Sequence, residues 1–425
     1  MKRKPVLLVL GGGRLQKKII KQAEEKGIAV AVVDCNPKAP GMSLGSYSFN
    51  ISTNDYKRNL LIARKLNISG ILTIGTDQPV TVAAKISHEL NLPSFISPET
   101  ALLATNKKKM KLTLSNNNIP TAKYITINNV KDKETVKEKI KSLKFPVVIK
   151  PVDSQGQRGV FFVDNEHVLF DYINEALKYS RAGNLIVEEY VKGYEVTASA
   201  WIYKNKLYLL ILTDRVTYFN PPSIGICLAH IFPSKYGSQY FEEIKKLLKR
   251  TVEAFNINEG PLYVQMLLTK RGPIIVELAC RVGGGHEEDL IPLVTGVDVR
   301  QCLIDYALGK QYKFNEYDFN YDLIKGHYGI FFIVAKGIDK VLNCVALKKQ
   351  VSNKALICGE FYVVKGDMVK HLTNATDRIG AFLVKGKDRA DLLMNAKQIY
   401  NQLNIMGDKY SNLIEDIFTL PLKGL

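Results

Sequence analysis

The sequence predicts a protein of mixed α/β and α+β class that folds into three domains. Its 425 residues exceed what one hydrophobic core usually organises. The first hundred residues alternate apolar strand-like runs with helical patterns, which is typical of an open parallel α/β domain. From about residue 311 the chain becomes rich in Tyr, Phe and Asn, and then in strand-like segments. We therefore expect an N-terminal α/β domain over 1–105, a central part over 106–310 and a small α+β domain over 311–425.

The first domain begins with a strand, a glycine loop and a helix. The apolar run over 5–10 ends at Gly11–Gly13, a helical pattern reaches Lys26, and a second strand over 29–33 ends at Asp34. Because the loop lacks the G-x-G-x-x-G spacing, a tight turn is favoured over a dinucleotide site with Asp34 at the ribose. The loop could still bind an anionic substrate group at the helix N-terminus. The pattern continues with a helix over 55–67, a strand over 70–74 and a helix over 80–90.

The rest of the chain mixes longer strands with single helices. A polar glycine loop over 153–160 lies between two of the strands. The predicted central elements are a basic helix from 106, a charged helix over 131–143, strands over 145–150 and 185–191, a hairpin of 194–203 with 207–213, and helices over 239–255 and 298–308. In the third domain we expect strands over 328–335, 356–364 and 380–385, and a final helix over 388–403.

One strand pair carries the most informative chemistry. Two strand-like stretches flank a Lys270–Gly272 turn, and each bears one oxygen side chain that can ligate a metal, Gln265 and Glu277. In an antiparallel hairpin these two residues lie near one another on neighbouring strands. Hard oxygen ligands beside the cation Arg281 suit Mg²⁺ that bridges nucleotide phosphates. The hairpin therefore predicts phosphoryl-transfer chemistry.

Charge and cysteine content favour a cytoplasmic protein that does not bind nucleic acid. The net charge is +18, but the lysines are spread along the chain and are not interleaved with aromatic residues as a nucleic-acid platform requires. The six cysteines form no CxxC motif, so we expect reduced thiols. No apolar stretch is long enough to cross a bilayer, so we expect no membrane partner.

Eight charged or polar residues occur in an informative order along the chain: Lys107, Lys150, Glu188, Glu189, Glu195, Gln265, Glu277 and Arg281. This order resembles the ATP-grasp superfamily, which includes biotin carboxylase, D-alanine–D-alanine ligase, carbamoyl phosphate synthetase and the L-amino-acid ligases. The resemblance covers about 1–310 as the N-terminal and ATP-grasp domains, the latter with two α+β subdomains and a glycine-loop lid at about 120–190. Asp377–Gly380 with Val384–Gly386 resembles the closing domain of the carboxylase-like and amino-acid-ligase branches.

The resemblance implies an ATP site. Lys107 and Lys150 would contact phosphates, although Lys107 also fits a solvated lysine in a basic run. The loop from Ser154 to Gly159, with Gly156 between them, would cover the β- and γ-phosphates, unless it is an ordinary hairpin turn. The resemblance also implies that Glu188, Glu189 and Val191 contact the adenine edge and that Glu195 accepts from the ribose hydroxyls. The alternative is that these glutamates lie on the solvent-exposed face of a strand.

The metal site departs from the family pattern. Gln265 stands where members usually carry an acid, and Ala279 replaces the asparagine of Glu-x-Asn. With Glu277 as the best ligand for Mg²⁺, or for Mn²⁺ as the alternative ion, three readings stay open: one ion held less tightly, ligands supplied by substrate, or lost activity. Arg281 would stabilise the acyl phosphate and the tetrahedral intermediate, with a structural salt bridge as its alternative role.

The substrate side is implied by a second stretch. His230 and Pro233 keep a Glu-x-x-His pattern of the amino-acid-ligase branch, but Cys227 replaces the glutamate, which puts recognition of a free α-amino group in doubt. His230 could orient the nucleophile, assist proton removal or be structural. Gly283–Gly285 would admit a substrate carboxylate to backbone N–H groups, and His286 would line that pocket or cap a helix.

The resemblance implies an ATP-dependent carboxylate–amine ligase. A substrate carboxylate would attack the γ-phosphate of Mg-ATP to give an acyl phosphate, which an amine from a second small molecule would then attack. The partners expected are therefore a small carboxylate and an amine, such as an amino acid or another metabolite, and dimers are common in the family. The alternatives are a carboxylase or formyl-transferring enzyme and a degenerate nucleotide-binding protein without turnover.

Overall fold

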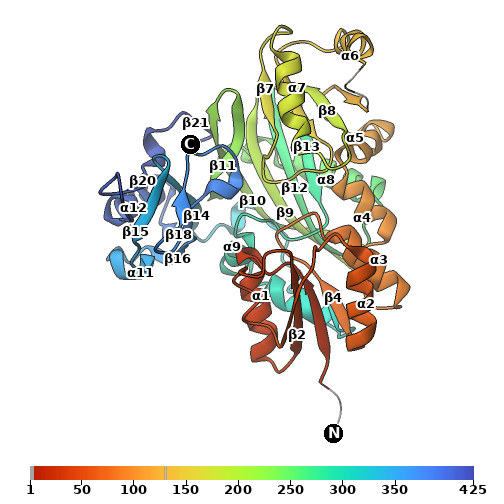
Figure 1. Cartoon of the computed structure of the whole chain (residues 1–425), viewed down its shortest axis with the longest axis vertical. Coiled ribbons are helices and arrows are strands. Elements are labelled where there is room, and N and C mark those ends of the chain that lie inside the picture. The colour runs from red at the N-terminus through yellow and green to blue at the C-terminus, as the bar shows by residue number, and fades with distance from the viewer. Residues whose placement is uncertain (1–3, 129, 131) are drawn as a thin grey trace.

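The computed structural model describes residues 4–128, 130 and 132–425. In Figure 1 the N-terminal domain forms one end of the molecule, a small lid forms the other, and the C-terminal region lies to one side of the long strands between them. The charged helix predicted over 131–143 is α6, Lys133–Ile140, and residue 131 of that prediction lies outside the described residues. We use the element labels of Figure 1 throughout.

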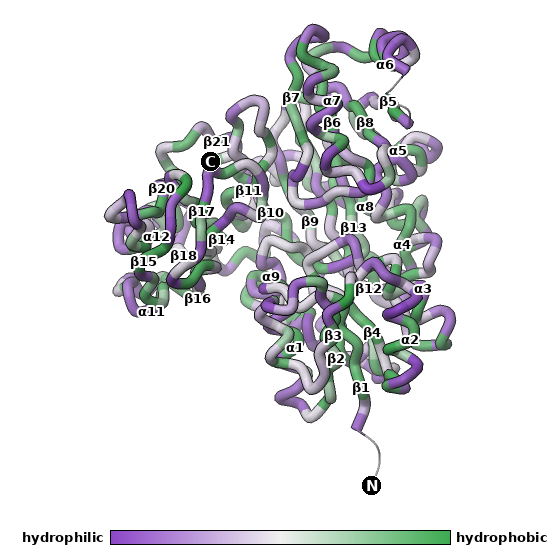
Figure 2. The backbone as a smooth tube through the Cα atoms, in the orientation of Figure 1, coloured by the Kyte–Doolittle hydropathy of each residue, from purple (hydrophilic) through white to green (hydrophobic). Residues whose placement is uncertain are grey.

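The N-terminal domain is the predicted open parallel sheet, in the order β3-β2-β1-β4. Helices lie beside it, so β1 is buried along its whole length, as a strand of a covered parallel sheet must be. Figure 2 shows β1 and β2 largely in the hydrophobic colour. The elements are β1 Val6–Leu10, α1 Arg14–Glu25, β2 Ala29–Asp34, β3 Tyr47–Asn50, α2 Tyr56–Leu66, β4 Gly70–Leu72, α3 Val80–Glu89, α4 Pro98–Thr105 and α5 Lys107–Asn116.

The lid is a separate antiparallel sheet in the order β5-β8-β6-β7. Two helices pack on it around a core of aliphatic side chains such as Val147, Ile149 and Ile173. The elements are β5 Tyr124–Ile127, α6 Lys133–Ile140, β6 Val147–Pro151, β7 Phe161–Val163, α7 Leu169–Leu177 and β8 Leu185–Glu189. The glycine loop connects β6 to β7, so it projects from the lid.

A large antiparallel sheet joins the central part to the C-terminal region. Among the described residues its main path runs β13-β12-β9-β10-β11-β14-β18-β16, and β20 and β21 pair at its sides. The strands after residue 311 therefore continue the central sheet through the β11–β14 ladder. The strands are β9 Tyr194–Tyr203, β10 Lys206–Asn220, β11 Ser223–Phe232, β12 Gly260–Thr269, β13 Gly272–Ala279, β14 His327–Ala335, β16 Leu356–Phe361, β18 Gly380–Gly386, β20 Ile414–Glu415 and β21 Leu422–Lys423.

One strand is longer than the sequence predicts. The strand expected over 207–213 is β10, which continues to Asn220 and pairs with β11. The prediction was wrong because Asp214 and Arg215 interrupt the apolar run. Both side chains are buried, and Asp214 is satisfied by Ser234, the Lys235 backbone N–H and Arg389, so the strand carries these charges without a break.

The remaining elements complete the C-terminal region and the helical cover. A small sheet in the order β17-β15-β19 lies beside the large one. In the part of the chain that the structure describes, we find no helix with the length and apolar character needed to span a bilayer. These elements are α8 Phe241–Ala254, α9 Glu287–Thr295, α10 Val299–Ala307, β15 Asp339–Asn343, α11 Leu347–Gln350, β17 Met368–Val369, α12 Arg389–Gln402 and β19 Met406–Gly407.

Candidate active site

The two predicted metal ligands meet across the β12–β13 hairpin. Gln265 and Glu277 are direct partners in the antiparallel register, as the sequence predicts. Lys107, from the first turn of α5, places its Nζ 2.9 Å from Glu277 Oε1. Burial lowers the pKa of Lys107, but Glu277 outweighs it and raises the pKa above its usual value. The hairpin thus brings a carboxylate, an amide and an ammonium group together.

A second cluster of charges lies under the lid. Glu188 Oε2 accepts from the ammonium groups of both Lys150 and Lys111, each at 3.1 Å. Burial alone would raise the pKa of Glu188, but Lys111 and Lys150 lower it. Glu188 was predicted at the adenine edge, and its side chain serves to hold these two lysines. The sequence analysis missed Lys111, which follows Lys107 by four residues and therefore shares its helix face.

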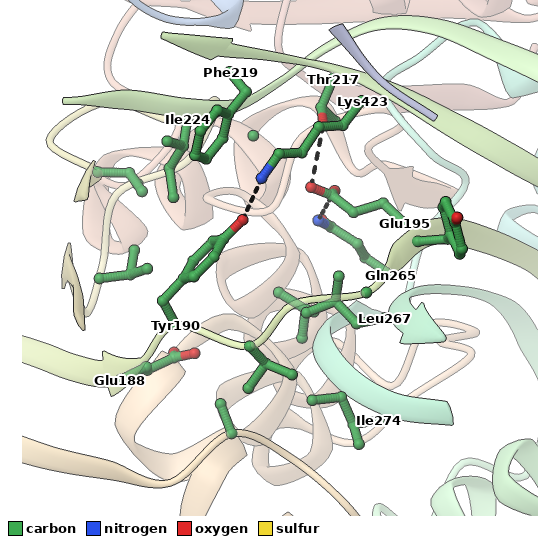
Figure 3. Close-up of a pocket in the computed structure, with 18 of the residues that line it drawn as sticks. Glu188, Tyr190, Glu195, Thr217, Phe219, Ile224, Gln265, Leu267, Ile274 and Lys423 are labelled. Carbon is green, nitrogen blue, oxygen red and sulfur yellow. Dashed lines mark hydrogen bonds between the residues drawn. The ribbon is translucent and has the colours of Figure 1, made fainter. Parts of the chain in front are cut away.

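An apolar pocket of about 230 Å³ lies between the lid and the large sheet. The β8 end and the segment after it, Glu188–Val191, line one side, and Leu267 and Ile274 line another. Figure 3 shows Glu195 and Gln265 pointing toward one another at one end, where Gln265 Nε2 donates to Glu195 Oε2 at 2.8 Å. The dimensions and lining suit a flat heterocycle bound between aliphatic side chains.

A larger, cationic cavity of about 360 Å³ adjoins this pocket. Lys150 and Gln265 line both spaces. Among the described residues, the buried Nε atoms of Arg215 and Arg378 have no hydrogen-bond partner, so they are donors available to a ligand. The predicted site residues that line the larger cavity are Lys107, Lys150, Ser154, Gly156, His230, Gln265, Glu277 and Arg281.

The glycine loop lines this cavity and hydrogen-bonds both to the N-terminal domain and to the C-terminal region. Gln155 donates through Nε2 to Thr76 Oγ1 at 2.7 Å and accepts from the Asp77 backbone N–H at 2.9 Å. The Ala375 backbone N–H donates to Gly156 O at 2.9 Å. The lid therefore contacts both the N-terminal domain and the C-terminal region.

Gly159 does not line either cavity. Its φ is +73°, and a Cβ there would lie 2.9 Å from side-chain atoms of Pro151 and Tyr179. Glycine is therefore required for packing within the lid. Of the two predicted loop glycines, Gly156 lines the larger cavity and Gly159 does not.

Arg281 forms a salt bridge and also faces a cavity. It lines the cationic cavity and is fixed by Asp77, whose Oδ1 accepts from Nε at 2.8 Å and from a terminal nitrogen at 2.7 Å. Its guanidinium also lies 5.0 Å from the Tyr263 ring centroid. Burial opposes the charge of Arg281, but Asp77 raises its pKa overall. The salt bridge thus orients a cation toward the cavity.

His230 lies at the far end of the same cavity, in a buried polar group. Its Nε2 is 3.3 Å from Cys227 Sγ and 3.7 Å from Glu287 Oε1. Burial lowers the pKa of His230, but Cys227 and Glu287 raise it overall. Gly285 also lines the cavity, whereas His286 occupies the N-cap position of α9 without a side-chain capping bond.

Comparison with known proteins places this geometry in a family. Residues 105–286 match the model of the phosphoribosylglycinamide synthetase ATP-grasp (A) domain. The phosphoribosylamine–glycine ligase of Pyrococcus furiosus is 27% identical over 324 residues, which are 71% of this chain and 72% of that protein. The corresponding ligase of Methanococcus maripaludis is 28% identical over 335 residues, 73% of this chain and 74% of that one. Residues 105–286 are an ATP-grasp domain, as the resemblance implied. Over most of its length the chain is similar to carboxylate–amine ligases of that superfamily.

Solved structures agree with the fold of this ATP-grasp chain. The L-amino acid ligase from Bacillus licheniformis superposes with a TM-score of 0.78 at 18% identity, over 95% of this chain and 99% of that one. Phosphoribosylglycinamide synthetase from Anaerococcus prevotii gives a TM-score of 0.72 at 23% identity, again over 95% and 99%. Both superpositions include the C-terminal region.

The ATP-grasp site has residues that fit Mg-ATP. The apolar pocket suits the base, and Glu195 at its end can accept from hydroxyls. The adjoining lysines and arginines suit phosphates, and Glu277 with the amide of Gln265 offers oxygen ligands for a hard cation. Sequence reasoning assigned no site role to several residues that share this site: Lys111, Asp77, Arg215, Arg378, Tyr190, Phe219 and Lys423.

Proposed function

We propose that this protein binds Mg-ATP across the two adjoining cavities and joins a small carboxylate to an amine. The observation that carries the proposal is the convergence of Lys107, Lys150, Gln265, Glu277 and Arg281 on one cavity beside an apolar pocket. The relatives named above are glycine and amino-acid ligases, so we infer that one substrate is an amino acid or a metabolite of similar size.

In the proposed reaction a carboxylate oxygen of the acid attacks the γ-phosphorus of ATP and ADP leaves. The amine nitrogen then attacks the carbonyl carbon of the acyl phosphate, loses a proton and expels inorganic phosphate. Lys107 and Lys150 hold phosphate oxygens, and Arg281 stabilises the charge that develops on the acyl group. The glycine loop, held by Thr76 and Ala375, keeps water from the acyl phosphate.

Two residues would hold the metal. Glu277 would supply a carboxylate and Gln265 an amide oxygen, and the bound ion, Mg²⁺ or Mn²⁺, neutralises charge on the phosphates. In the structure Glu277 is instead paired with Lys107. We infer that, when Mg-ATP binds, a phosphate replaces Glu277 as the partner of Lys107 and the metal ion replaces Lys107 as the partner of Glu277. Both side-chain charges are then compensated before and after binding.

His230 suits an orienting role better than that of a base. Its Nδ1 lies 3.4 Å from Thr213 Oγ1 and its Nε2 lies 3.3 Å from Cys227 Sγ, so both ring nitrogens already have polar partners. We therefore assign to His230 the positioning of the acyl or amine group beside Cys227.

A homodimer remains a prediction, and sedimentation of the purified chain would test it.

The test is release of ADP and phosphate from Mg-ATP with pairs of small acids and amines, followed by mass detection of the product. Glu277→Gln should reduce turnover at least a hundredfold, about 3 kcal/mol of activation free energy. Glu253→Gln, at an exposed carboxylate, is the matched control and should keep activity within twofold. Full turnover by Glu277→Gln would refute the metal assignment. Nucleotide binding without ADP release for any pair would favour the degenerate nucleotide-binding protein.

A further inference from the structure

A short segment near the end of the sequence lies along the nucleotide pocket. Strand β21 pairs with β10 so that Lys423 is opposite Thr217, and the Phe219 backbone N–H donates to Pro421 O at 2.9 Å. Arg389, which is held at 2.7 Å by buried Asp214, donates to Gly424 O at 3.5 Å. These bonds fix the backbone of the segment beside the pocket. Lys423 and its partner Thr217 are neighbours in the sheet although they are far apart in the sequence.

The Lys423 side chain lines the pocket. In Figure 3 it extends from beside Thr217 toward Tyr190 and passes over Phe219. Its Nζ donates to the Tyr190 hydroxyl and lies 3.3 Å from the Phe219 ring centroid and 5.1 Å from that of Tyr190. Cation–π attraction to two rings stabilises this position.

The ammonium group has capacity to bind a further group. Lysine has three N–H donors, and none of the ion pairs within the described residues includes Lys423. Its electrostatic neighbour is Glu195, which accepts from Thr217 Oγ1 at 3.3 Å. Partial burial lowers the pKa of Lys423 despite this carboxylate. Lys423 therefore lies on the Glu195 side of the pocket, with a charge that is incompletely compensated.

We propose that Lys423 is a nucleotide-binding residue that closes the ribose end of the pocket and donates to an oxygen of the ribose or of the adjoining phosphate. This inference rests on the proposed function, because it requires the pocket to take a nucleotide. A lysine provides a compact point charge for phosphate and a donor for a hydroxyl. The segment 421–424 would thus make the C-terminal region part of the ATP site.

The test is calorimetric binding of ADP and of adenosine to the full chain and to Lys423→Met, which keeps the stem and removes the charge. We expect Lys423→Met to weaken ADP binding about tenfold, or about 1.4 kcal/mol. Unchanged adenosine binding would then assign the contact to phosphate, and an equal loss for adenosine would assign it to ribose. Lys423→Arg should retain most of the affinity. Lys397→Met, at an exposed lysine of α12, should bind as the unmodified chain does.

Two results would overturn the inference, and they are distinguishable. If the unmodified chain binds ADP and Lys423→Met binds it within twofold of that affinity, the role of Lys423 is wrong and the proposed function stands. If the unmodified chain binds neither ADP nor ATP, the proposed function fails and this inference fails with it. Because Lys423 is exposed, the variant should unfold at the same temperature as the unmodified chain.

Discussion

Gln265 and Glu277 face one another directly across the β12–β13 ladder, so any charge placed at 265 acts on a metal bound at 277. Gln265→Glu should therefore lower the Mg²⁺ concentration for half-maximal ADP release, by roughly threefold to tenfold, because a second carboxylate attracts a divalent cation more strongly than an amide does. Gln265→Leu, of similar volume, should raise the Mg²⁺ concentration needed for half-maximal ADP release. Titration of ADP release with Mg²⁺ measures both, and an identical Mg²⁺ dependence in all three proteins would show that residue 265 is not a ligand.

Replacement of Lys111 should affect stability more than any exposed lysine does. Lys111→Met removes one of two cations from Glu188, whose side chain is 5% exposed. Loss of one partner from a buried ion pair typically costs about 3 kcal/mol of unfolding free energy, and urea unfolding would measure it. Lys109→Met, on the exposed face of the same helix, should change the unfolding free energy by less than about 0.5 kcal/mol. Equal effects of the two substitutions would contradict a structural role for Lys111.

Glu188 should make stability sensitive to acid. Lys111 and Lys150 outweigh the effect of burial and lower its pKa below the ordinary value of 4.5. A carboxyl group with a lowered folded-state pKa contributes stability above its unfolded value and loses that contribution as the pH falls through the folded value. Urea unfolding between about pH 3 and 7 should show the unmodified chain losing more stability below pH 4.5 than Glu188→Gln does. Parallel curves would refute the assignment.

Gln155 should control opening of the lid. Its side chain hydrogen-bonds to both Thr76 and Asp77, so Gln155→Ala removes the side-chain contact between the glycine loop and these two residues of the N-terminal domain. We expect amide hydrogen exchange over 153–160 to become about tenfold faster, which corresponds to about 1.4 kcal/mol. Gln239→Ala, at an exposed glutamine, should leave the exchange rate unchanged. If both variants exchange alike, the loop is held by other contacts.

The sequence was sufficient for the parts of the fold that follow from local periodicity. The parallel N-terminal sheet and the hairpin that pairs Gln265 with Glu277 were predicted from apolar runs and one turn, and both are confirmed. The resemblance to the ATP-grasp superfamily was predicted from the order of charged residues and is confirmed by the match over residues 105–286. The roles of the individual site residues stay predictions until the experiments above are done.

What escaped prediction depends on contacts between distant segments. Asp214 is buried in a strand only because Ser234 and Arg389 satisfy it, and no local pattern signals those partners. Arg281 was placed in the site, but its orientation comes from Asp77 in another domain. Lys423 belongs to a two-residue strand, which is too short to give a periodic signal.

The residues that line the nucleotide pocket are far apart in the sequence, which affects when the pocket can form during translation. Its lining begins at Ala122 and reaches Gly424, and the sheet beneath it is completed only by strands that follow residue 327. During translation the N-terminal sheet can fold as soon as it leaves the ribosome, because its strands are close in sequence. The pocket cannot form until synthesis has reached Gly424, because residues up to that position line it. A nascent chain that stalls between His327 and Gly424 would therefore present an unfinished sheet edge to chaperones and proteases, without ligand binding to stabilise it.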